Sequence, residues 1–242
     1  MPQKRSKVEG RRSKGAFIQR LFTGIAPRYD WFNRLASGGM DRRWRTVAVR
    51  RGEIRLGHDV LDVCTGTGDL ALLCAEELSG RGRIVGLDMN PGMLLRAQEK
   101  QARRGAQIGW VQGDAQRMPF ATGTFDRVVI GFSTRNLPDL TMGLREMVRV
   151  LRPNGRLVIL ETGRPSNPIL RFGYLVFLFT IARLIGWCLT GRLWPFTYLA
   201  QSVRRFITPQ QLVERLRTCQ TRASYVPLSW GCASLYVATK TP

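Results

Sequence analysis

Short apolar runs alternate with longer mixed segments along most of this chain, from about residue 60 to the C-terminus. Several runs are apolar at every position, which is typical of strands in a parallel sheet covered on both faces. Asn90 before Pro91 and Thr208 before Pro209 are helix start signals. The pattern predicts an α/β fold, with a seven-stranded, mostly parallel sheet and helices on both faces. The predicted strands are residues 60–64, 83–87, 108–112, 125–131, 156–161, 223–227 and 234–239, and the predicted helices are residues 69–78, 91–103, 140–151 and 209–217.

Two segments lie outside this alternation. Residues 16–52 are predicted to form one or two helices ahead of the sheet, and residues 166–203 are an aromatic and apolar insertion after the fifth strand. Insertions at the carboxyl edge of an open α/β sheet are where substrate specificity is usually built. We therefore expect both segments to form a lid over the crevice of one domain, residues 16–242.

The chain is strongly basic, with a formal net charge of +21 over 242 residues and a hydrophobic fraction of 44%. The hydrophobic fraction supports a packed core. A charge of this size favours an anionic partner, which could be nucleic acid, a membrane surface or an acidic substrate. Residues 1–15 hold six basic side chains and are predicted to form a disordered basic tail.

Metal and secretion signals are weak. The five cysteines form no C-x-x-C pair and His58 is the one histidine, so we expect reduced thiols and no metal site. No secretory leader is expected, because no apolar region follows the basic N-terminus. Arg171 and Arg183 interrupt the main apolar stretch, so no transmembrane helix is expected.

The strongest motif is Val60-Leu-Asp-Val-Cys-Thr-Gly-Thr-Gly-Asp69. Gly66 and Gly68 allow a tight turn and a close approach of the backbone to a ligand. Asp88 lies 20 residues beyond Gly68, the distance at which a nucleotide-binding unit places an acid against ribose hydroxyls. The third glycine of the dinucleotide fingerprint is missing, which favours a nucleoside without phosphates. S-adenosylmethionine fits, and Asp62 and Asp69 suit its cationic sulfonium.

Further motifs resemble one family. They are Ala26-Pro-Arg-Tyr-Asp30, Asn33 through Ser37 to Asp41-Arg-Arg-Trp44, Gly113-Asp-Ala115 with Met118-Pro-Phe120, Phe132-Ser-Thr-Arg-Asn136, and Arg149-Val-Leu-Arg-Pro-Asn-Gly-Arg-Leu157 leading to Glu161. From about Phe22 to Phe206 the chain resembles the class I S-adenosylmethionine methyltransferases of menaquinone and ubiquinone biosynthesis. These Rossmann-like enzymes C-methylate a polyprenyl quinol ring. Ser133 and Thr134 depart from the family pattern, so the motifs leave the identity of the quinol open.

The resemblance implies a set of cofactor-binding residues. Asp88 would accept from the ribose hydroxyls, Thr67 would contact the cofactor, and Asp114 with the Ala115 amide would bind adenine. The plainer alternatives are a loop acid at Asp88, a helix cap at Thr67 and a turn former at Asp114. Met89 is also a candidate, although a methionine here is more often a packing residue. With Asp62, Gly66 and Gly68 these complete the predicted cofactor site.

The resemblance also implies the catalytic residues Arg135, Asn136, Tyr29 and Asp30. Arg135 suits stabilisation of a phenolate or orientation of a water, because a guanidinium stays protonated in proteins. Tyr29 and Asp30 would close over the ring and help to relay its proton. The alternative is a surface arginine beside a helix-capping asparagine.

The insertion offers a use for the basic charge. Its apolar side chains, punctuated by arginines, suit a helix at an anionic membrane surface, although two core helices fit the pattern equally well. We expect a cytoplasmic enzyme, peripherally associated with the inner face of the membrane. A phospholipid N-methyltransferase, an RNA methyltransferase or nucleic-acid-binding protein, and a homodimer remain open. The apolar set is Phe172, Tyr174, Leu175, Phe177, Leu178, Phe179, Ile181, Leu184, Ile185, Trp187 and Trp194.

Overall fold

All seven predicted strands are present in the computed structural model. It describes the backbone of residues 2–242, and their side chains except those of residues 2–9, 11 and 12. In chain order the elements are α1 (Pro2–Ile25), η1 (Ala26–Arg28), α2 (Tyr29–Ala36), α3 (Met40–Arg51), β1 (Asp59–Val63), α4 (Asp69–Leu78), β2 (Arg83–Asp88), α5 (Pro91–Arg104), β3 (Gly109–Gln112), β4 (Phe125–Gly131), η2 (Thr134–Asn136), α6 (Leu140–Arg149), β5 (Leu151–Thr162), α7 (Pro168–Phe179), α8 (Ile181–Thr190), α9 (Trp194–Arg205), α10 (Pro209–Arg217), β6 (Thr221–Leu228), η3 (Ser229–Gly231) and β7 (Ala233–Lys240).

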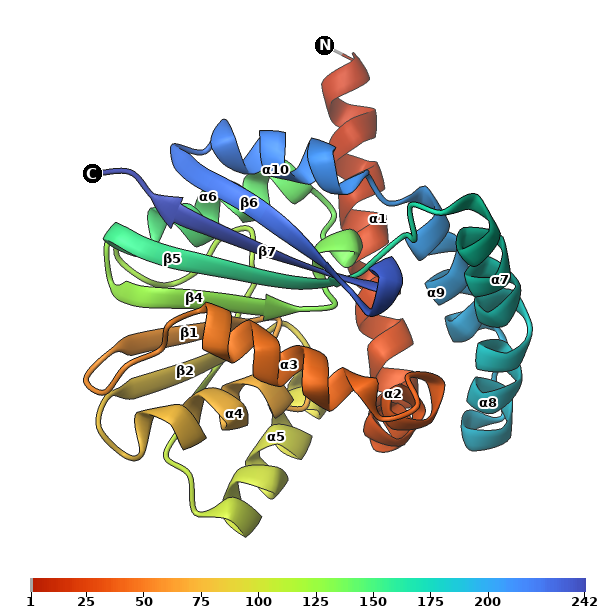
Figure 1. The fold of residues 1–242 in the computed structure, drawn as a ribbon, viewed down its shortest axis with the longest axis horizontal. Coiled ribbons are helices and arrows are strands. Elements are labelled where there is room, and N and C mark those ends of the chain that lie inside the picture. Colours follow the sequence, from red (N-terminus) through yellow and green to blue (C-terminus); the bar gives the residue numbers. More distant parts are fainter. Residues whose placement is uncertain (1) are drawn as a thin grey trace.

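The strands form one sheet in the order β3-β2-β1-β4-β5-β7-β6 (Figure 1). Neighbours from β3 to β5 pair in parallel, whereas β7 pairs antiparallel with both β5 and β6. The predicted mostly parallel sheet is confirmed. Its order reverses between β1 and β4, so the crevice beside β1 is the expected place for a ligand.

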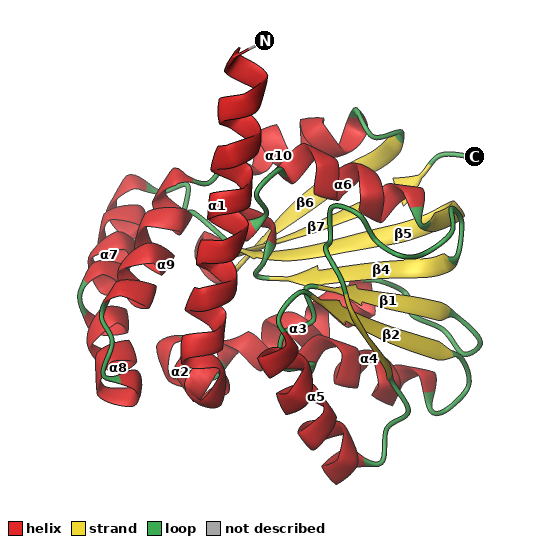
Figure 2. Ribbon diagram, turned by 180° about the vertical axis from the view of Figure 1, so that it is seen from behind, coloured by secondary structure: helices red, strands yellow, loops and turns green. Residues whose placement is uncertain are grey.

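Both faces of the sheet are covered, which explains the continuously apolar strands. In β5, Leu157 and Ile159 belong to one buried cluster, while Val158 and Leu160 belong to the cluster on the opposite face. Successive side chains of a strand point to opposite faces, so a strand buried on both sides must be apolar throughout. Helices α3 and α4 cover one face, and α6 and α10 cover the other (Figures 1 and 2).

Helix boundaries follow local capping signals. The side chain of Asn90 accepts hydrogen bonds from the backbone N–H groups of Gly92 and Met93 at the start of α5. Thr208 and Gln211 form a reciprocal capping box at the start of α10. Helices α4 and α10 begin and end where predicted, whereas β5 is longer than predicted because it continues through the turn at Asn154.

The N-terminal prediction requires a correction. We predicted a disordered tail over residues 1–15, but the backbone is helical from Pro2 onward in α1. Met1 and the side chains of residues 2–9, 11 and 12 lie outside the described part. Lys14 is packed into the domain, where its Nζ donates to the carbonyl of Leu137 at 2.8 Å. This long-range contact, which no local pattern indicates, places Lys14 within the folded domain.

The inserted segment forms three helices, α7, α8 and α9, that stand beside the carboxyl edge of the sheet (Figures 1 and 2). Because of Arg171 and Arg183 we expected no segment that could span a membrane. The structure differs: by length and composition, Pro168–Thr190 is long and apolar enough to cross one. Its most apolar stretch has a mean hydropathy of 1.8 and is 17% buried. A break at Thr180 divides it into α7 and α8.

Candidate active site

A cavity of about 520 Å³ lies at the carboxyl edge of the sheet, where β1 to β4 end. Helix α1 closes one side with residues between Gly15 and Phe22, and the loop after β4 closes another between Ser133 and Pro138. Open α/β sheets bind their ligands at this edge. We call this space the larger cavity.

The glycine turn after β1 presents its backbone to the larger cavity. Gly66 has φ +57° and Gly68 has φ +81°, conformations that glycine adopts without strain. A Cβ atom at Gly68 would lie 2.8 Å from the Trp110 ring and 3.0 Å from Ala97, so this glycine is needed for packing. A Cβ atom at Gly66 would meet nothing within 4 Å, and its place is open to a ligand.

Asp62 braces this turn from within the protein. Its Oδ2 accepts from Thr65 Oγ1 at 2.6 Å and from the Ala71 backbone N–H at 3.0 Å. The side chain is buried, and burial raises its pKa from 3.8 to about 7 although both hydrogen bonds oppose the shift. Asp62 lines the larger cavity as predicted, and its recorded hydrogen bonds hold the turn and the first turn of α4.

Asp88 ends β2 and lines the larger cavity opposite the glycine turn. Its Oδ2 accepts from the Gly66 backbone N–H and its Oδ1 from that of Asn90, both at 2.8 Å. Burial raises the pKa of this carboxyl, and the backbone hydrogen bonds lower it in part. A carboxylate has about four acceptor positions, so two remain for a ligand. These two backbone hydrogen bonds fix the orientation of the Asp88 carboxylate.

The remaining predicted cofactor positions also line the larger cavity. Asp114 follows β3, and its Oδ1 accepts from the Gln116 backbone N–H at 2.9 Å. Ala115 is buried beside it, and Met89 and Met93 line the wall next to Asp88. An open backbone at Gly66, acceptors at β2 and β3, and apolar side chains between them fit the ribose, the amino group and the ring of an adenosyl ligand.

Thr67 takes part in a network that joins the N-terminal segment to the turn. Its hydroxyl donates to Asp30 Oδ1 at 2.6 Å and accepts from Lys100 Nζ at 2.9 Å. Lys100 also pairs with Asp30 and with Asp69, each at 2.6 Å. The helix-capping alternative for Thr67 is wrong, because α4 has no side-chain cap. Asp30 itself lines neither cavity; through Thr67 and Lys100 it ties α2 to the cofactor turn.

A smaller cavity of about 130 Å³ adjoins the larger one. Phe22, Tyr29 and Asn136 line both, so they form the boundary between the two spaces. The walls of the smaller cavity come mainly from the N-terminal helices and the insertion. They are largely aromatic, with Phe32, Trp44, Phe132, Tyr174, Phe177, Phe196 and Tyr198.

Arg135 lies in the wall of the smaller cavity, held by a buried ion pair. Its Nη1 pairs with Glu161 Oε1 and donates to the Phe132 carbonyl at 2.7 Å. Glu161 also accepts from the Thr134 hydroxyl at 2.5 Å. Among the described residues, the buried Nε of Arg135 has no hydrogen-bond acceptor. Arg135 is therefore oriented by the protein and keeps one donor unused.

The titratable groups of the smaller cavity offer no free base. Burial raises the pKa of Tyr29, whose ring packs edge-on against Phe22 with centroids 5.8 Å apart. Asp41, a carboxylate in this wall, is held by Arg45 Nη1 at 2.7 Å.

Sequence reasoning missed several residues of this region. Asp41 and Arg45 are four residues apart on one helix, a spacing that signals an ion pair. Lys100, Glu161 and Tyr198 carry no such signal, because their partners are distant in sequence. Part of the predicted membrane-facing set also points inward: Tyr174, Phe177 and Leu178 line the smaller cavity.

Solved structures confirm the fold. A S-adenosylmethionine-dependent methyltransferase from Aquifex aeolicus superimposes with a TM-score of 0.64, covering 87% of this chain and 97% of its own. The two sequences are 15% identical, so this likeness concerns the fold alone.

Proteins found by sequence comparison share a much higher identity with this chain. The chain is 37% identical over 238 residues to a demethylmenaquinone methyltransferase of Deinococcus radiodurans, covering 98% of each protein. It is 38% identical over 232 residues to a ubiquinone/menaquinone biosynthesis C-methyltransferase of Geobacter sp. strain M21, covering 94% of this chain and 97% of the relative. Residues 8–240 match the ubiE/COQ5 methyltransferase family. With a cavity that fits S-adenosylmethionine, this chain belongs to the ubiE/COQ5 family and is a S-adenosylmethionine-dependent C-methyltransferase.

Proposed function

We propose that this enzyme methylates a ring carbon of a polyprenyl quinol, with demethylmenaquinol as the first candidate. The observation that carries the proposal is the aromatic smaller cavity, which meets the larger cavity at Phe22, Tyr29 and Asn136. Aromatic walls favour a flat ring through stacked and edge-on contacts. A ring in this space lies next to the cofactor site. Relatives over nearly the full length of the chain carry the name demethylmenaquinone methyltransferase.

S-adenosylmethionine, when bound, supplies an electrophilic methyl group. Asp88 would hold the ribose, Asp114 and the Ala115 amide the adenine, and the backbone at Gly66 would approach the cofactor closely. Asp69 would place a carboxylate near the cationic sulfonium, while Asp62 braces the turn through Thr65 and Ala71. Burial opposes ionisation of Asp69, but Lys100 and Arg45 outweigh it and lower its pKa, so Asp69 remains charged.

The protein contributes alignment and charge stabilisation to the reaction. Proximity of two oriented groups can lower a barrier by roughly 7–11 kcal/mol. A ring carbon becomes a better nucleophile as the neighbouring hydroxyl loses its proton. Arg135 and Asn136 supply donors that stabilise the resulting ring oxygen anion. Because Tyr29 stays protonated and Asp41 is held by Arg45, water in the cavity receives the proton.

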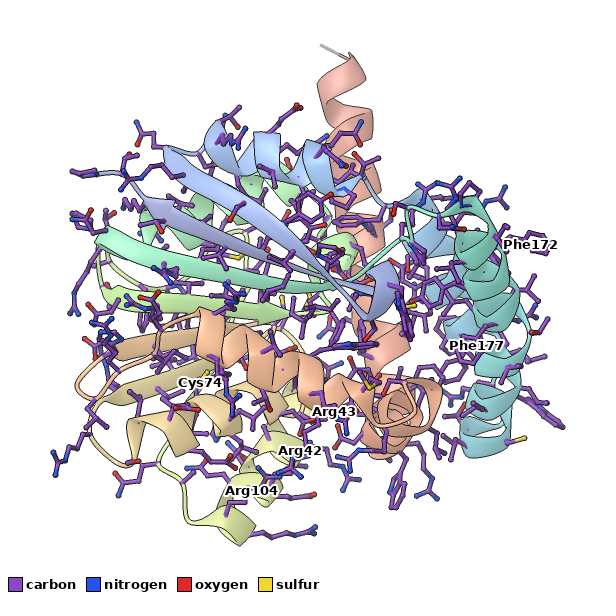
Figure 3. The ribbon with its side chains drawn as sticks, in the orientation of Figure 1. Arg42, Arg43, Cys74, Arg104, Phe172 and Phe177 are labelled. Atoms are coloured by element: carbon purple, nitrogen blue, oxygen red, sulfur yellow. The ribbon has the colours of Figure 1, made fainter. Side chains whose placement is uncertain are left out.

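The substrate tail gives the insertion a function. Ile169, Phe172 and Val176 of α7 and Leu184 and Trp187 of α8 are exposed at helical spacing, and we call them the outer stripe. Phe172 points away from the domain, whereas Phe177 lies on the inner side and lines the smaller cavity (Figure 3). We propose that the outer stripe lies in the interface of an anionic membrane, so that a polyprenyl tail stays in the lipid while its ring enters.

The reaction is tested with labelled S-adenosylmethionine and reduced demethylnaphthoquinol. We expect Asp88→Ala to raise the Kd for S-adenosylmethionine about 10- to 100-fold by calorimetry, because a charged acceptor is lost. Arg135→Ala should mainly lower kcat. Since it also leaves Glu161 buried without its partner, the double variant Arg135→Ala/Glu161→Gln separates turnover from stability.

Glu99→Ala is the control for Asp88. This carboxylate pairs with Arg96 on α5 outside both cavities, so its loss should leave the Kd unchanged. Absence of a methylated quinol from the wild-type reaction would remove the proposed function. Normal turnover in Arg135→Ala would remove Arg135 from the mechanism.

A further inference from the structure

Tyr198, from α9 of the insertion, reaches the boundary between the two cavities. Its hydroxyl donates to Asn136 Oδ1 at 3.2 Å, across 62 positions of the sequence. Asn136 is buried and lines both cavities, and Tyr198 lines the smaller one. The insertion therefore contacts a residue of the active site directly.

This hydrogen bond decides which way the Asn136 amide points. A carboxamide is planar, with an acceptor oxygen on one side and two N–H donors on the other. With the oxygen engaged by Tyr198, the NH₂ group is directed elsewhere. Among the described residues, no acceptor for Asn136 Nδ2 is recorded. A free donor at this boundary suits an oxygen atom of the substrate ring.

Tyr198 is itself held in place. Its ring packs edge-on against Phe17 of α1, with centroids 5.2 Å apart and planes at 65°. Burial raises the pKa of the Tyr198 hydroxyl, and Glu161 raises it further while Arg135 opposes both. The hydroxyl therefore stays protonated and keeps its role as donor to Asn136 through neutral and mildly alkaline pH.

We propose that Tyr198 is a positioning residue, which turns the Asn136 amide so that its N–H donates to a ring oxygen beside the methyl-accepting carbon. The inference rests on the proposed function, because it requires a hydroxylated ring in the smaller cavity. Through this contact, the membrane-facing insertion completes the active site, and a correctly packed α9 is a condition for catalysis.

The test is Tyr198→Phe, which removes one hydroxyl group and keeps the ring. With demethylnaphthoquinol as substrate, we expect kcat to fall about tenfold, the effect of one hydrogen bond in the transition state. The Kd for S-adenosylmethionine and the unfolding temperature should not change. In an Asn136→Ala background, Tyr198→Phe should lower kcat by less than about twofold, because the two residues act as one unit.

Tyr225→Phe is the matched control. The Tyr225 hydroxyl, on the edge strand β6, accepts from Gln210 and lines neither cavity, so kcat should match wild type. A wild-type kcat in Tyr198→Phe would overturn the positioning role. The role would also be overturned if Tyr198→Phe lowered kcat by the same factor in the Asn136→Ala background as in the wild type. A higher Kd for S-adenosylmethionine in Tyr198→Phe would also overturn the positioning role, because the hydroxyl would then maintain the fold of the cofactor site. If the wild type does not methylate the quinol, both the proposed function and this inference are wrong. If the wild type is active and Tyr198→Phe has the same kcat, the inference alone is wrong.

Discussion

At the scale of single residues, the site depends on carboxylates whose environments differ. Asp62 is buried and forms no ion pair with the described residues, whereas Asp69 pairs with Lys100 at the cavity wall. Burial accordingly raises the pKa of Asp62, and the nearby cations lower that of Asp69 despite burial. The pKa values of two acids seven positions apart are thus shifted in opposite directions.

The stability of the protein should carry a signature of Asp62. Its pKa rises from 3.8 to about 7 on folding, so between these values the folded protein holds a proton that the unfolded chain has lost. This contribution to stability is therefore lost as pH rises from about 4 to about 7. Asp62→Asn keeps an oxygen for Thr65 and Ala71 but cannot ionise. Urea unfolding at several pH values should show a flatter profile for the variant, and an unchanged slope would refute the assignment.

Sequence reasoning at this scale succeeded where the signal was local. Asp88 was located by its distance from Gly68. Asp88 lines the larger cavity together with Gly66, whereas Gly68 packs against Trp110. Thr67 and Asp30 were identified as site residues, but their link through Lys100 was not predicted. Lys100 lies in the second half of α5, and its role comes from its ion pair with Asp30 of α2, which is distant in sequence.

At the scale of elements, the sequence predicted α4 and α10 to the residue, with a cap signal at Thr208 for α10, and continuously apolar runs predicted the sheet. The boundaries of the N-terminal helices were harder to predict, because α1 continues without a stop signal from Pro2 to Ile25. The insertion was harder still. Its apolar residues divide into the outer stripe and the wall of the smaller cavity, and the sequence alone left core and membrane helices equally open.

The close packing of α8 on α9 depends on Gly186. A Cβ atom there would lie 2.2 Å from the Phe196 ring, which lines the smaller cavity. Gly186→Ala should therefore destabilise the protein by about 1–3 kcal/mol through overpacking and lower the quinol turnover. Gly173→Ala is the matched control on α7, where a Cβ atom meets nothing within 4 Å. Better helix propensity should make it neutral or stabilising by up to ~1 kcal/mol. Equal unfolding temperatures for the two variants would refute this packing role.

At the scale of the whole molecule, the two apolar surfaces of the insertion differ in exposure. The inner side lines the smaller cavity, and the outer stripe, with Ile169 81% and Phe172 71% exposed, has no protein neighbour to cover it among the described residues. The net charge of +21 adds attraction to an anionic surface. Leu178, Ala182 and Gly186 of helices α7 and α8 pack against α9. We expect this helix pair to lie along a membrane surface, with one face on the protein and the other in lipid.

Vesicle binding tests this arrangement. The wild-type protein should sediment with phosphatidylglycerol vesicles at low salt, bind phosphatidylcholine vesicles less, and dissociate as ionic strength rises. Removing one buried aromatic side chain costs about 1.5–3 kcal/mol, so Phe172→Asp should weaken the partition roughly tenfold or more. Leu95→Asp replaces an equally apolar, exposed side chain on α5, away from the outer stripe, and should bind like wild type. If both variants lose binding to the same extent, or if the wild type ignores anionic vesicles, then the insertion faces something other than lipid and the tail of the quinol must enter from solution.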